Sequence, residues 1–157
     1  MSKSKAKRPI EQIAALPVHW DKNGKLRVLM VTSRDRGRWV MPKGWQMDGK
    51  KPWRAAEIEA LEEAGAVGFI SETAIGHYHY DKRLDDGKKV LCRVTLYPMV
   101  VDTLKRRWKE SKQRKRHWFS LKKAARLVEE EELSSLLKAL TQRDDLRSII
   151  KELRDVA

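Results

Sequence analysis

The sequence contains a single cysteine, Cys92, among 157 residues. One cysteine cannot form a disulfide within the chain, and the four histidines form no Cys/His group at the spacing of a zinc site. No apolar run approaches the roughly 20 residues that cross a bilayer as a helix. The basic N-terminus has no apolar segment behind it of the kind that a secretory signal needs. These absences argue against a disulfide-rich secreted scaffold, and they predict a cytoplasmic location with no membrane partner.

Negative charge is also scarce, because 22 Asp and Glu stand against 35 Lys and Arg, for a net charge of +13. A surplus of this size indicates an anionic partner, which could be a nucleic acid, a polyphosphate metabolite or an acidic surface. The length suits one domain with its own hydrophobic core. We therefore expect a disordered basic tail over residues 1–9 and a single domain over residues 10–157.

Hydrophobic patterning and turn residues predict strands on both sides of one central helix. That helix should begin at Pro52, a proline in the first helical position, and end at Gly65, a typical C-terminal cap. Ser120 is expected to cap a further helix, and helical character continues from there to the C-terminus. Pro17 suggests that the first strand lies at an edge or carries a bulge. The class is therefore α/β or α+β, and the strands are expected over residues 12–20, 26–33, 39–44, 74–82, 90–101 and 116–119.

Three carboxylates share one face of the central helix: Glu59, Glu62 and Glu63. Like charges at this spacing destabilise a helix unless a cation lies nearby. Carboxylate oxygens are hard ligands that suit Mg²⁺, Mn²⁺ or Ca²⁺. The opposite face, which we expect to pack on the sheet, carries Ile58, Leu61 and Ala64.

The segment MPKGWQMDGKKPWRAAEIEALEEAG resembles the signature of the Nudix hydrolases, G-x5-E-x7-R-E-U-x-E-E-x-G-U, in which U is apolar. Two positions depart from it: Lys50 stands in place of the first glutamate, and Ile58 in place of an arginine that helps to hold the catalytic carboxylates. Residues 31–44 and 106–128 are also similar to the diphosphoinositol polyphosphate phosphohydrolases of this family. The positions that stand in register are Gly44, Glu59, Glu62, Glu63 and Gly65.

This resemblance implies the Nudix fold, a mixed β-sheet between α-helices, and hydrolysis of a phosphoanhydride bond by water with Mg²⁺ or Mn²⁺ as the cofactor. It also implies metal-binding roles for Glu62 and Glu63, with Glu59 as a further ligand or as the base that orients water. The backbone carbonyl of Lys43, beside Gly44, is expected to be another ligand. The loop carboxylate that often assists in this family is left open among Asp81, Asp85, Asp86 and Glu110.

The basic residues predict a pocket for a highly phosphorylated small molecule, either a dinucleoside polyphosphate or a diphosphoinositol polyphosphate. Aromatic residues that recognise a base, such as Trp45, Tyr78 or Tyr80, would favour a nucleotide, although tryptophans near a core usually pack. The basic run 105–116 is interpreted as a solvated loop, with RNA as the less favoured partner. The residues expected to bind substrate phosphates are Arg34, Arg38, Lys43, Lys82, Arg83, Lys88 and Arg93.

A second hypothesis remains open at this point. The chain could be a catalytically impaired module on a Nudix scaffold that binds RNA or polyphosphate, with Lys50 and Ile58 marking the loss of catalysis. The two hypotheses differ in what loss of the helix carboxylates should do. Turnover disappears in the first case, whereas ligand affinity stays almost unchanged in the second.

Overall fold

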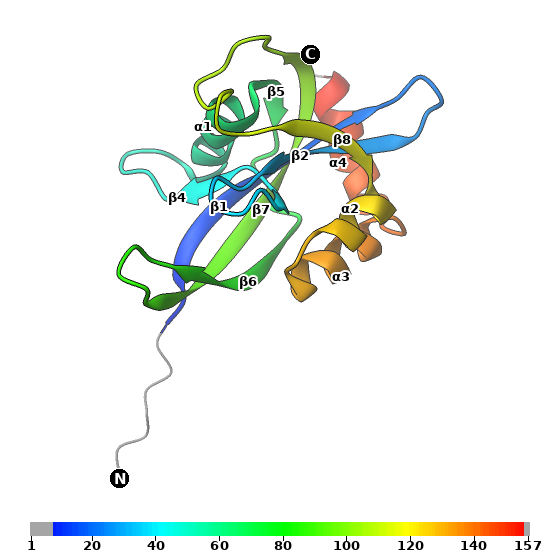
Figure 1. Ribbon diagram of the computed structural model, residues 1–157. Coiled ribbons are helices and arrows are strands. Elements are labelled where there is room, and N and C mark those ends of the chain that lie inside the picture. Colours follow the sequence, from blue (N-terminus) through cyan, green and yellow to red (C-terminus); the bar gives the residue numbers. More distant parts are fainter. Residues whose placement is uncertain (1–7, 156–157) are drawn as a thin grey trace.

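The computed structural model describes residues 8–155, so residues 1–7 of the expected basic tail lie outside the described part of the chain. Eight strands form one mixed sheet, and helices cover both of its faces (Figure 1). This architecture confirms the expected class, a mixed sheet between helices. The strands are β1 (Ile10–Trp20), β2 (Leu26–Thr32), β3 (Trp39–Val40), β4 (Lys43–Trp45), β5 (Ala66–Ile70), β6 (Gly76–Arg83), β7 (Lys89–Leu104) and β8 (Arg116–Ser120).

The two longest strands, β1 and β7, run parallel through the centre of the sheet, and each has two antiparallel partners along its length. Strand β1 pairs first with β4 and then with β2, while β7 pairs first with β6 and then with β5. Strands β4 and β6 therefore flank the first halves of the central pair.

The expectation that Pro17 marks an edge or a bulge is wrong. Strand β1 is central, and its register with β7 continues through Pro17 without a shift. Proline is tolerated because it stands between the residues of β1 that pair with β4 and those that pair with β2. Its missing amide hydrogen interrupts neither antiparallel ladder.

Helix α1 (Pro52–Ala64) covers one face of the sheet and has the bounds that the sequence predicts. Pro52 occupies the first turn, where its missing amide hydrogen is not needed. Gly65 ends the helix with a left-handed φ of 63° and donates its amide to the carbonyl of Leu61. Both helix ends are therefore confirmed.

The face of α1 that packs on the sheet is the expected one only in part, since Ala64 is buried as predicted. Leu61 is 37% exposed and Ile58 is half-buried, so the large apolar residues do not form the contact. Alanine side chains form the contact instead, and their small size lets the helix lie close to the larger residues of the sheet. Glu63 is buried on the same helix. Glu57, on the same helix, pairs with Arg54. The buried apolar residues of α1 are Ala55, Ala56, Ala60 and Ala64.

Three shorter helices cover the other face: α2 (Leu121–Leu127), α3 (Glu131–Leu140) and α4 (Asp144–Asp155) (Figure 1). The Ser120 hydroxyl accepts a hydrogen bond from the Lys123 amide, which confirms the predicted cap. The helical C-terminal region is, however, interrupted between these helices rather than continuous. None of the helices within residues 8–155 has the length and apolar character needed to cross a membrane.

Strand β5 follows α1 immediately and was not predicted from the sequence. Gly68 weakens its strand signal. A Cβ at Gly68 would overlap the backbone carbonyl of Val100 on β7. Gly68 therefore weakens the sequence signal for a strand and at the same time allows β5 to lie close to β7. Pairing with β7, rather than local propensity, establishes this strand.

Candidate active site

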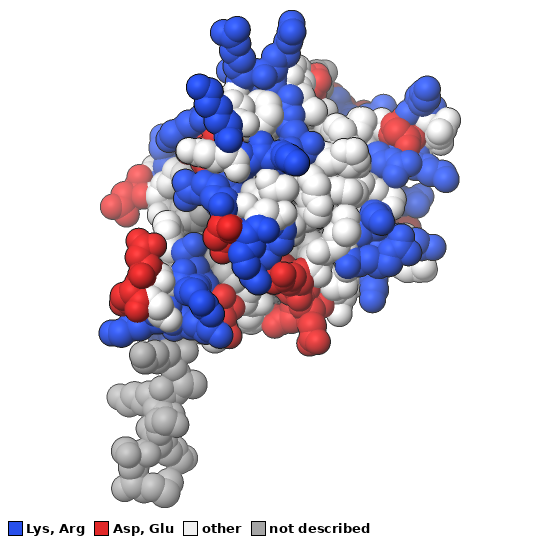
Figure 2. Space-filling model, viewed as in Figure 1, with Lys and Arg blue, Asp and Glu red and all other residues white. Residues whose placement is uncertain are grey.

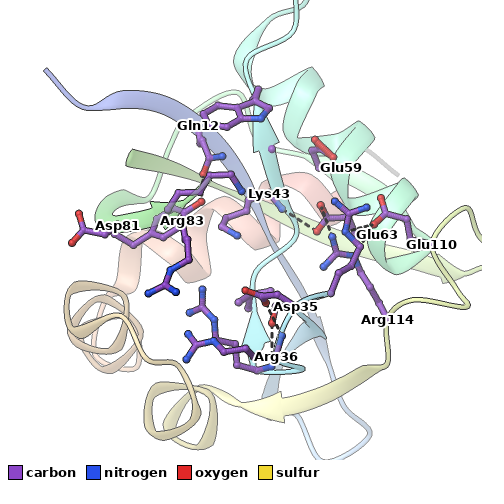
Figure 3. Close-up of a pocket in the computed structure, with 18 of the residues that line it drawn as sticks. Gln12, Asp35, Arg36, Lys43, Glu59, Glu63, Asp81, Arg83, Glu110 and Arg114 are labelled. Atoms are coloured by element: carbon purple, nitrogen blue, oxygen red, sulfur yellow. Dashed lines mark hydrogen bonds and ion pairs between the residues drawn. The ribbon is translucent and has the colours of Figure 1, made fainter. Parts of the chain in front are cut away.

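A pocket of about 900 Å³ lies over the sheet at strands β4, β1 and β6. The second half of α1, the loop before β3 and the loop between β7 and β8 form its walls. Carboxylates of Glu59, Glu63 and Glu110 lie on one side of it, while Arg83 lies on another (Figure 3). Lys and Arg gather in several groups on the face of the molecule shown in Figure 2, with acidic side chains between some of them and uncharged residues over much of the centre.

Glu59 lies against the backbone of Gly44. A Cβ at position 44 would overlap the Glu59 carboxylate, so glycine leaves this side chain in place. Burial, with repulsion from Glu63 and Glu62, raises the pKa of Glu59 to about 7. A carboxyl group with this pKa can gain or lose a proton near neutral pH.

Glu63 is buried, with an exposed fraction of 6%. The Lys43 amide donates to Glu63 Oε1 at 3.3 Å, and Arg114 Nη2 lies 3.5 Å from Glu63 Oε2. Burial outweighs both favourable contacts and raises the pKa of Glu63 to about 7. Together the two contacts fix the direction of this carboxylate.

Glu62 does not line the pocket, although the sequence predicted it to be a metal ligand. Lys109 Nζ lies 3.0 Å from Glu62 Oε2, and the lysine side chain is 69% exposed. An exposed ion pair of this kind is weak and can be exchanged for another partner. Within residues 8–155, no three acidic, histidine or cysteine side chains are already grouped closely enough to hold a metal ion.

Arg114 is a component of the site that the sequence did not reveal. It comes from the loop between β7 and β8, and its side chain is only 9% exposed. Besides Glu63 it contacts Glu110 Oε1, at 2.9 Å from Nε, and it donates to the backbone carbonyl of Thr32 at 3.0 Å. One guanidinium thus joins α1, β2 and its own loop.

Two more residues of the segment 105–116 contact α1, although most of its lysines and arginines are exposed, as a solvated loop predicts. Trp108 Nε1 donates to the backbone carbonyl of Glu63 at 2.9 Å. The Arg116 guanidinium lies 3.9 Å from the centre of the Trp108 ring and donates to the carbonyl of Ala64. These contacts satisfy carbonyls at the C-terminal end of α1, next to the carboxylates.

Among the four loop carboxylates left open by the sequence, Glu110 is the one that the structure joins to the helix carboxylates. Its amide donates to the Glu62 carbonyl, and its side chain pairs with Arg114. Asp81 and Asp85 line the pocket from the β6 side. Asp86 does not line the pocket and instead accepts a hydrogen bond from the Lys88 amide.

Five of the seven predicted phosphate-binding residues line the pocket: Arg34, Arg38, Lys43, Lys82 and Arg83. Lys88 lies outside it in the turn before β7. Arg93 also lies outside it, with Nη2 3.4 Å from His77 Nδ1. Arg38 is partly engaged, since its Nη1 lies 3.1 Å from Glu130 Oε2. Arg36 and Lys89 also line the pocket. Arg36 was not predicted, because nothing in its spacing separates it from other surface cations.

The donor set fits a hard divalent cation. Glu59 and Glu63 are carboxylates with pKa values raised to about 7, and two such groups side by side are unfavourable in their charged forms. A divalent cation between carboxylates removes that repulsion. Glu59, Glu63 and Glu110 line the same pocket, but their carboxylates, and that of Glu62, which pairs with Lys109, would have to move closer together to share one cation.

The chain is similar in sequence to a known family and to several named proteins. The sequence model of the NUDIX domain matches residues 11–140. Nudix hydrolase 12, mitochondrial, from Arabidopsis thaliana is 34% identical over 106 residues, which cover 66% of this chain and 52% of that protein. Human diphosphoinositol polyphosphate phosphohydrolase 3-alpha is 30% identical over 104 residues, covering 65% of this chain and 59% of that protein. The chain thus spans between half and two thirds of the length of these relatives.

Solved structures share the fold. A crystal structure of the C. elegans Ap4A hydrolase superposes with a TM-score of 0.61 at 22% identity, covering 86% of this chain and 98% of that one. A Nudix hydrolase from Nitrosomonas europaea gives a TM-score of 0.64 at 18% identity, covering 86% and 90%. At these identities the likeness concerns the fold alone.

Proposed function

Because this chain belongs to the Nudix family of hydrolases, we propose that it is a divalent-metal-dependent pyrophosphohydrolase that cleaves a phosphoanhydride bond in a highly phosphorylated small molecule. One observation carries this proposal. The carboxylates of the half-buried Glu59 and the buried Glu63 of α1 line the same pocket as a set of lysine and arginine side chains. Acidic groups suit a divalent cation, and basic groups suit the phosphates that this cation would meet.

The ligands of the cation would be Glu59, Glu62 and Glu63, with the Lys43 carbonyl beside Gly44 and with Glu110 as the loop carboxylate. A bound divalent cation neutralises phosphate charge and lowers the pKa of a coordinated water. Mg²⁺ is the proposed ion, and Mn²⁺ offers the same hard-ligand chemistry.

The residues of the chain itself have separable roles. Arg34, Lys82 and Arg83 bind the phosphates, and the Lys43 ammonium, which lies 5.1 Å from the Tyr80 ring centre, is directed into the same pocket. Glu59 makes no ion pair or hydrogen bond with another side chain among residues 8–155, so its carboxylate is available to take a proton from the attacking water.

The substrate class follows from the number of basic residues around the pocket. We propose a dinucleoside polyphosphate or a diphosphoinositol polyphosphate, the two classes that the sequence predicted. Relatives and structural neighbours carry the corresponding names, an Ap4A hydrolase and a diphosphoinositol polyphosphate phosphohydrolase. A cytoplasmic location also stays a prediction, since several relatives are named as mitochondrial.

The alternative, a binding module without catalysis, is favoured by two features. Lys50 and Ile58 replace two signature residues, and Glu62 contacts Lys109 rather than the pocket. Arg114 argues against this alternative. Its ion pair with Glu63 fixes the direction of a carboxylate that lines the pocket, which catalysis would need and phosphate binding would not.

The test is hydrolysis of a panel by the purified protein with Mg²⁺ or Mn²⁺, using diadenosine polyphosphates, nucleoside triphosphates, triphosphorylated RNA and diphosphoinositol polyphosphates. Glu63→Gln is the variant, and Glu72→Gln, an exposed residue outside the pocket, is the matched control. We expect cleavage of at least one substrate that Glu63→Gln abolishes and Glu72→Gln retains. Tight binding without cleavage, unchanged in Glu63→Gln, would instead establish the binding module.

A further inference from the structure

Trp45 is the single aromatic residue among the large hydrophobic side chains that are exposed within residues 8–155. Its exposed fraction is 43%, and it lies in the wall of the pocket that contains Glu59 and Glu63. Apolar ring surface left in water is unfavourable, so a ligand that covers it gains binding free energy. The other exposed large hydrophobic side chains do not line this pocket: Ile10, Leu61, Val67 and Leu91.

Gln12 supplies a polar group beside this ring. It lies directly opposite Trp45 in the pairing of β1 with β4, so the two side chains project from the same face of the sheet. Gln12 is only 3% exposed and also lines the pocket. The Tyr80 hydroxyl donates a 2.6 Å hydrogen bond to Gln12 Oε1. The amino group of Gln12 is therefore the part of its carboxamide left to donate to a ligand.

An aromatic ring with a hydrogen-bond donor at its edge suits a nucleobase. The base stacks on the ring, and an acceptor nitrogen or oxygen on its edge meets the donor. Lys82 Nζ lies 5.7 Å from the centre of the Trp45 ring. A stacked base is generally held more strongly than an ammonium group over an exposed ring. The base would therefore displace Lys82, which could then contact a phosphate.

From this geometry we infer that Trp45 and Gln12 form a nucleobase subsite, and that the substrate is a nucleoside polyphosphate rather than an inositol pyrophosphate. The inference rests on the proposed function, since it identifies one end of the substrate in the same pocket. An inositol ring has no π face, and its phosphates and hydroxyls do not match an exposed indole. The phosphates of a nucleotide on Trp45 would instead extend toward the carboxylates beside Gly44, the neighbouring residue of β4.

The test is calorimetric titration of the full chain with ADP and with inorganic diphosphate, in EDTA so that no turnover occurs. The two probes share their diphosphate and differ in the nucleoside. We expect ADP to bind more tightly, and Trp45→Ala to weaken ADP binding by about tenfold or more while leaving diphosphate binding unchanged. Trp45→Phe keeps a stacking ring and should retain most of the ADP affinity. Leu91→Ala, which removes an exposed apolar side chain outside the pocket, should change neither.

The inference is wrong if ADP binds no more tightly than diphosphate, whether both bind or neither does. It is also wrong if Trp45→Ala weakens both probes equally or leaves ADP binding unchanged. Because this titration needs no catalysis, its result is independent of the hydrolysis panel. Loss of ADP affinity in Trp45→Ala, together with no Glu63-dependent cleavage of any substrate, would reject the hydrolase and retain the base subsite.

Discussion

Arg114 Nη2 lies 3.5 Å from Glu63 Oε2, which joins the loop between β7 and β8 to the second half of α1. Counting side-chain atoms alone, Arg114 is 9% exposed and Glu63 is 8% exposed. In the signature that this sequence resembles, an arginine stands at the position of Ile58 and helps to hold the carboxylates. Here the cation that orients Glu63 comes from a distant segment of the chain.

Replacing Arg114 by methionine should destabilise the protein in a pH-dependent way. Removing one partner of a buried ion pair costs about 3–5 kcal/mol when the other charge stays ionised. We expect a loss of about 3 kcal/mol at pH 8, and a smaller loss at pH 5, where Glu63 is protonated. Chemical denaturation at both pH values measures the difference. Lys112→Met, an exposed lysine of the same loop, is the control, and an equal loss for Arg114→Met at the two pH values would contradict the assignment.

Gly44→Ala should lower activity far more than stability. The added Cβ would overlap the Glu59 carboxylate and force it to move, and displacement of a catalytic group by about 1 Å can cost on the order of 100-fold in rate. The backbone of Gly44 is not left-handed, so alanine adds no backbone strain there. Steady-state kinetics and thermal melts measure the two effects.

If Glu59 is the group affected, Gly44→Ala should have little further effect in a Glu59→Gln background. Fully additive losses in the double variant would show that Gly44 acts through another residue.

The metal-free protein should lose stability as the pH rises from about 4.5 to about 7. The pKa values of Glu59 and Glu63 are raised from 4.5 to about 7 in the folded state, so that state binds more protons than the unfolded chain within this window. The free energy of unfolding therefore falls as pH increases. Thermal melts in EDTA across this range measure the trend, and Glu63→Gln should flatten it. A Glu63→Gln profile parallel to that of the wild-type protein would contradict the assigned shift.

Mg²⁺ should reverse this loss above pH 7 and release protons when it binds near pH 6, since ligands must be deprotonated. Titration calorimetry in two buffers with different ionisation enthalpies measures the proton count. Metal binding without proton release at pH 6 would place the ion away from Glu59 and Glu63.

Lys109→Met should increase the affinity for Mn²⁺ by a few fold. Glu62 has to leave Lys109 before it can bind a cation in the pocket, and an exposed ion pair of this kind opposes that exchange only weakly. Lys105→Met, another exposed lysine of the loop, should have little effect. Weaker Mn²⁺ binding in Lys109→Met would indicate that Lys109 supports the site rather than competing for Glu62.

Local chemistry made parts of the fold predictable. The bounds of α1 follow from Pro52 and Gly65, and the cap of α2 follows from Ser120, since each depends on conformational preferences of single residues. The packed face of α1 was predicted correctly only at Ala64, because alanines rather than Leu61 and Ile58 are the buried apolar residues of this helix. Residue size alone does not reveal how closely a helix approaches its sheet.

Some residues of the candidate site could also be predicted from the sequence, and others could not. Glu59, Glu63 and Gly44 could be predicted because they lie within one short segment at fixed spacing. Arg114 and Glu110 could not be singled out, because a basic run by itself predicts a solvated loop. The ion pairs of Arg114 with Glu63 and Glu110 are visible only in the structure. Long-range ion pairs of this kind leave no periodic pattern in a sequence.

The most direct test of the catalytic assignment is the initial rate of phosphoanhydride cleavage by the wild-type protein and by Glu59→Gln, each with saturating Mg²⁺ and with EDTA. A positioned general base or metal ligand contributes about 100-fold or more to such a rate. We predict that EDTA abolishes cleavage by the wild-type protein, and that Glu59→Gln loses at least that factor with Mg²⁺ while keeping the same circular dichroism. Cleavage that proceeds equally in Glu59→Gln, or equally in EDTA, would contradict the assignment of the reaction to the carboxylates of α1.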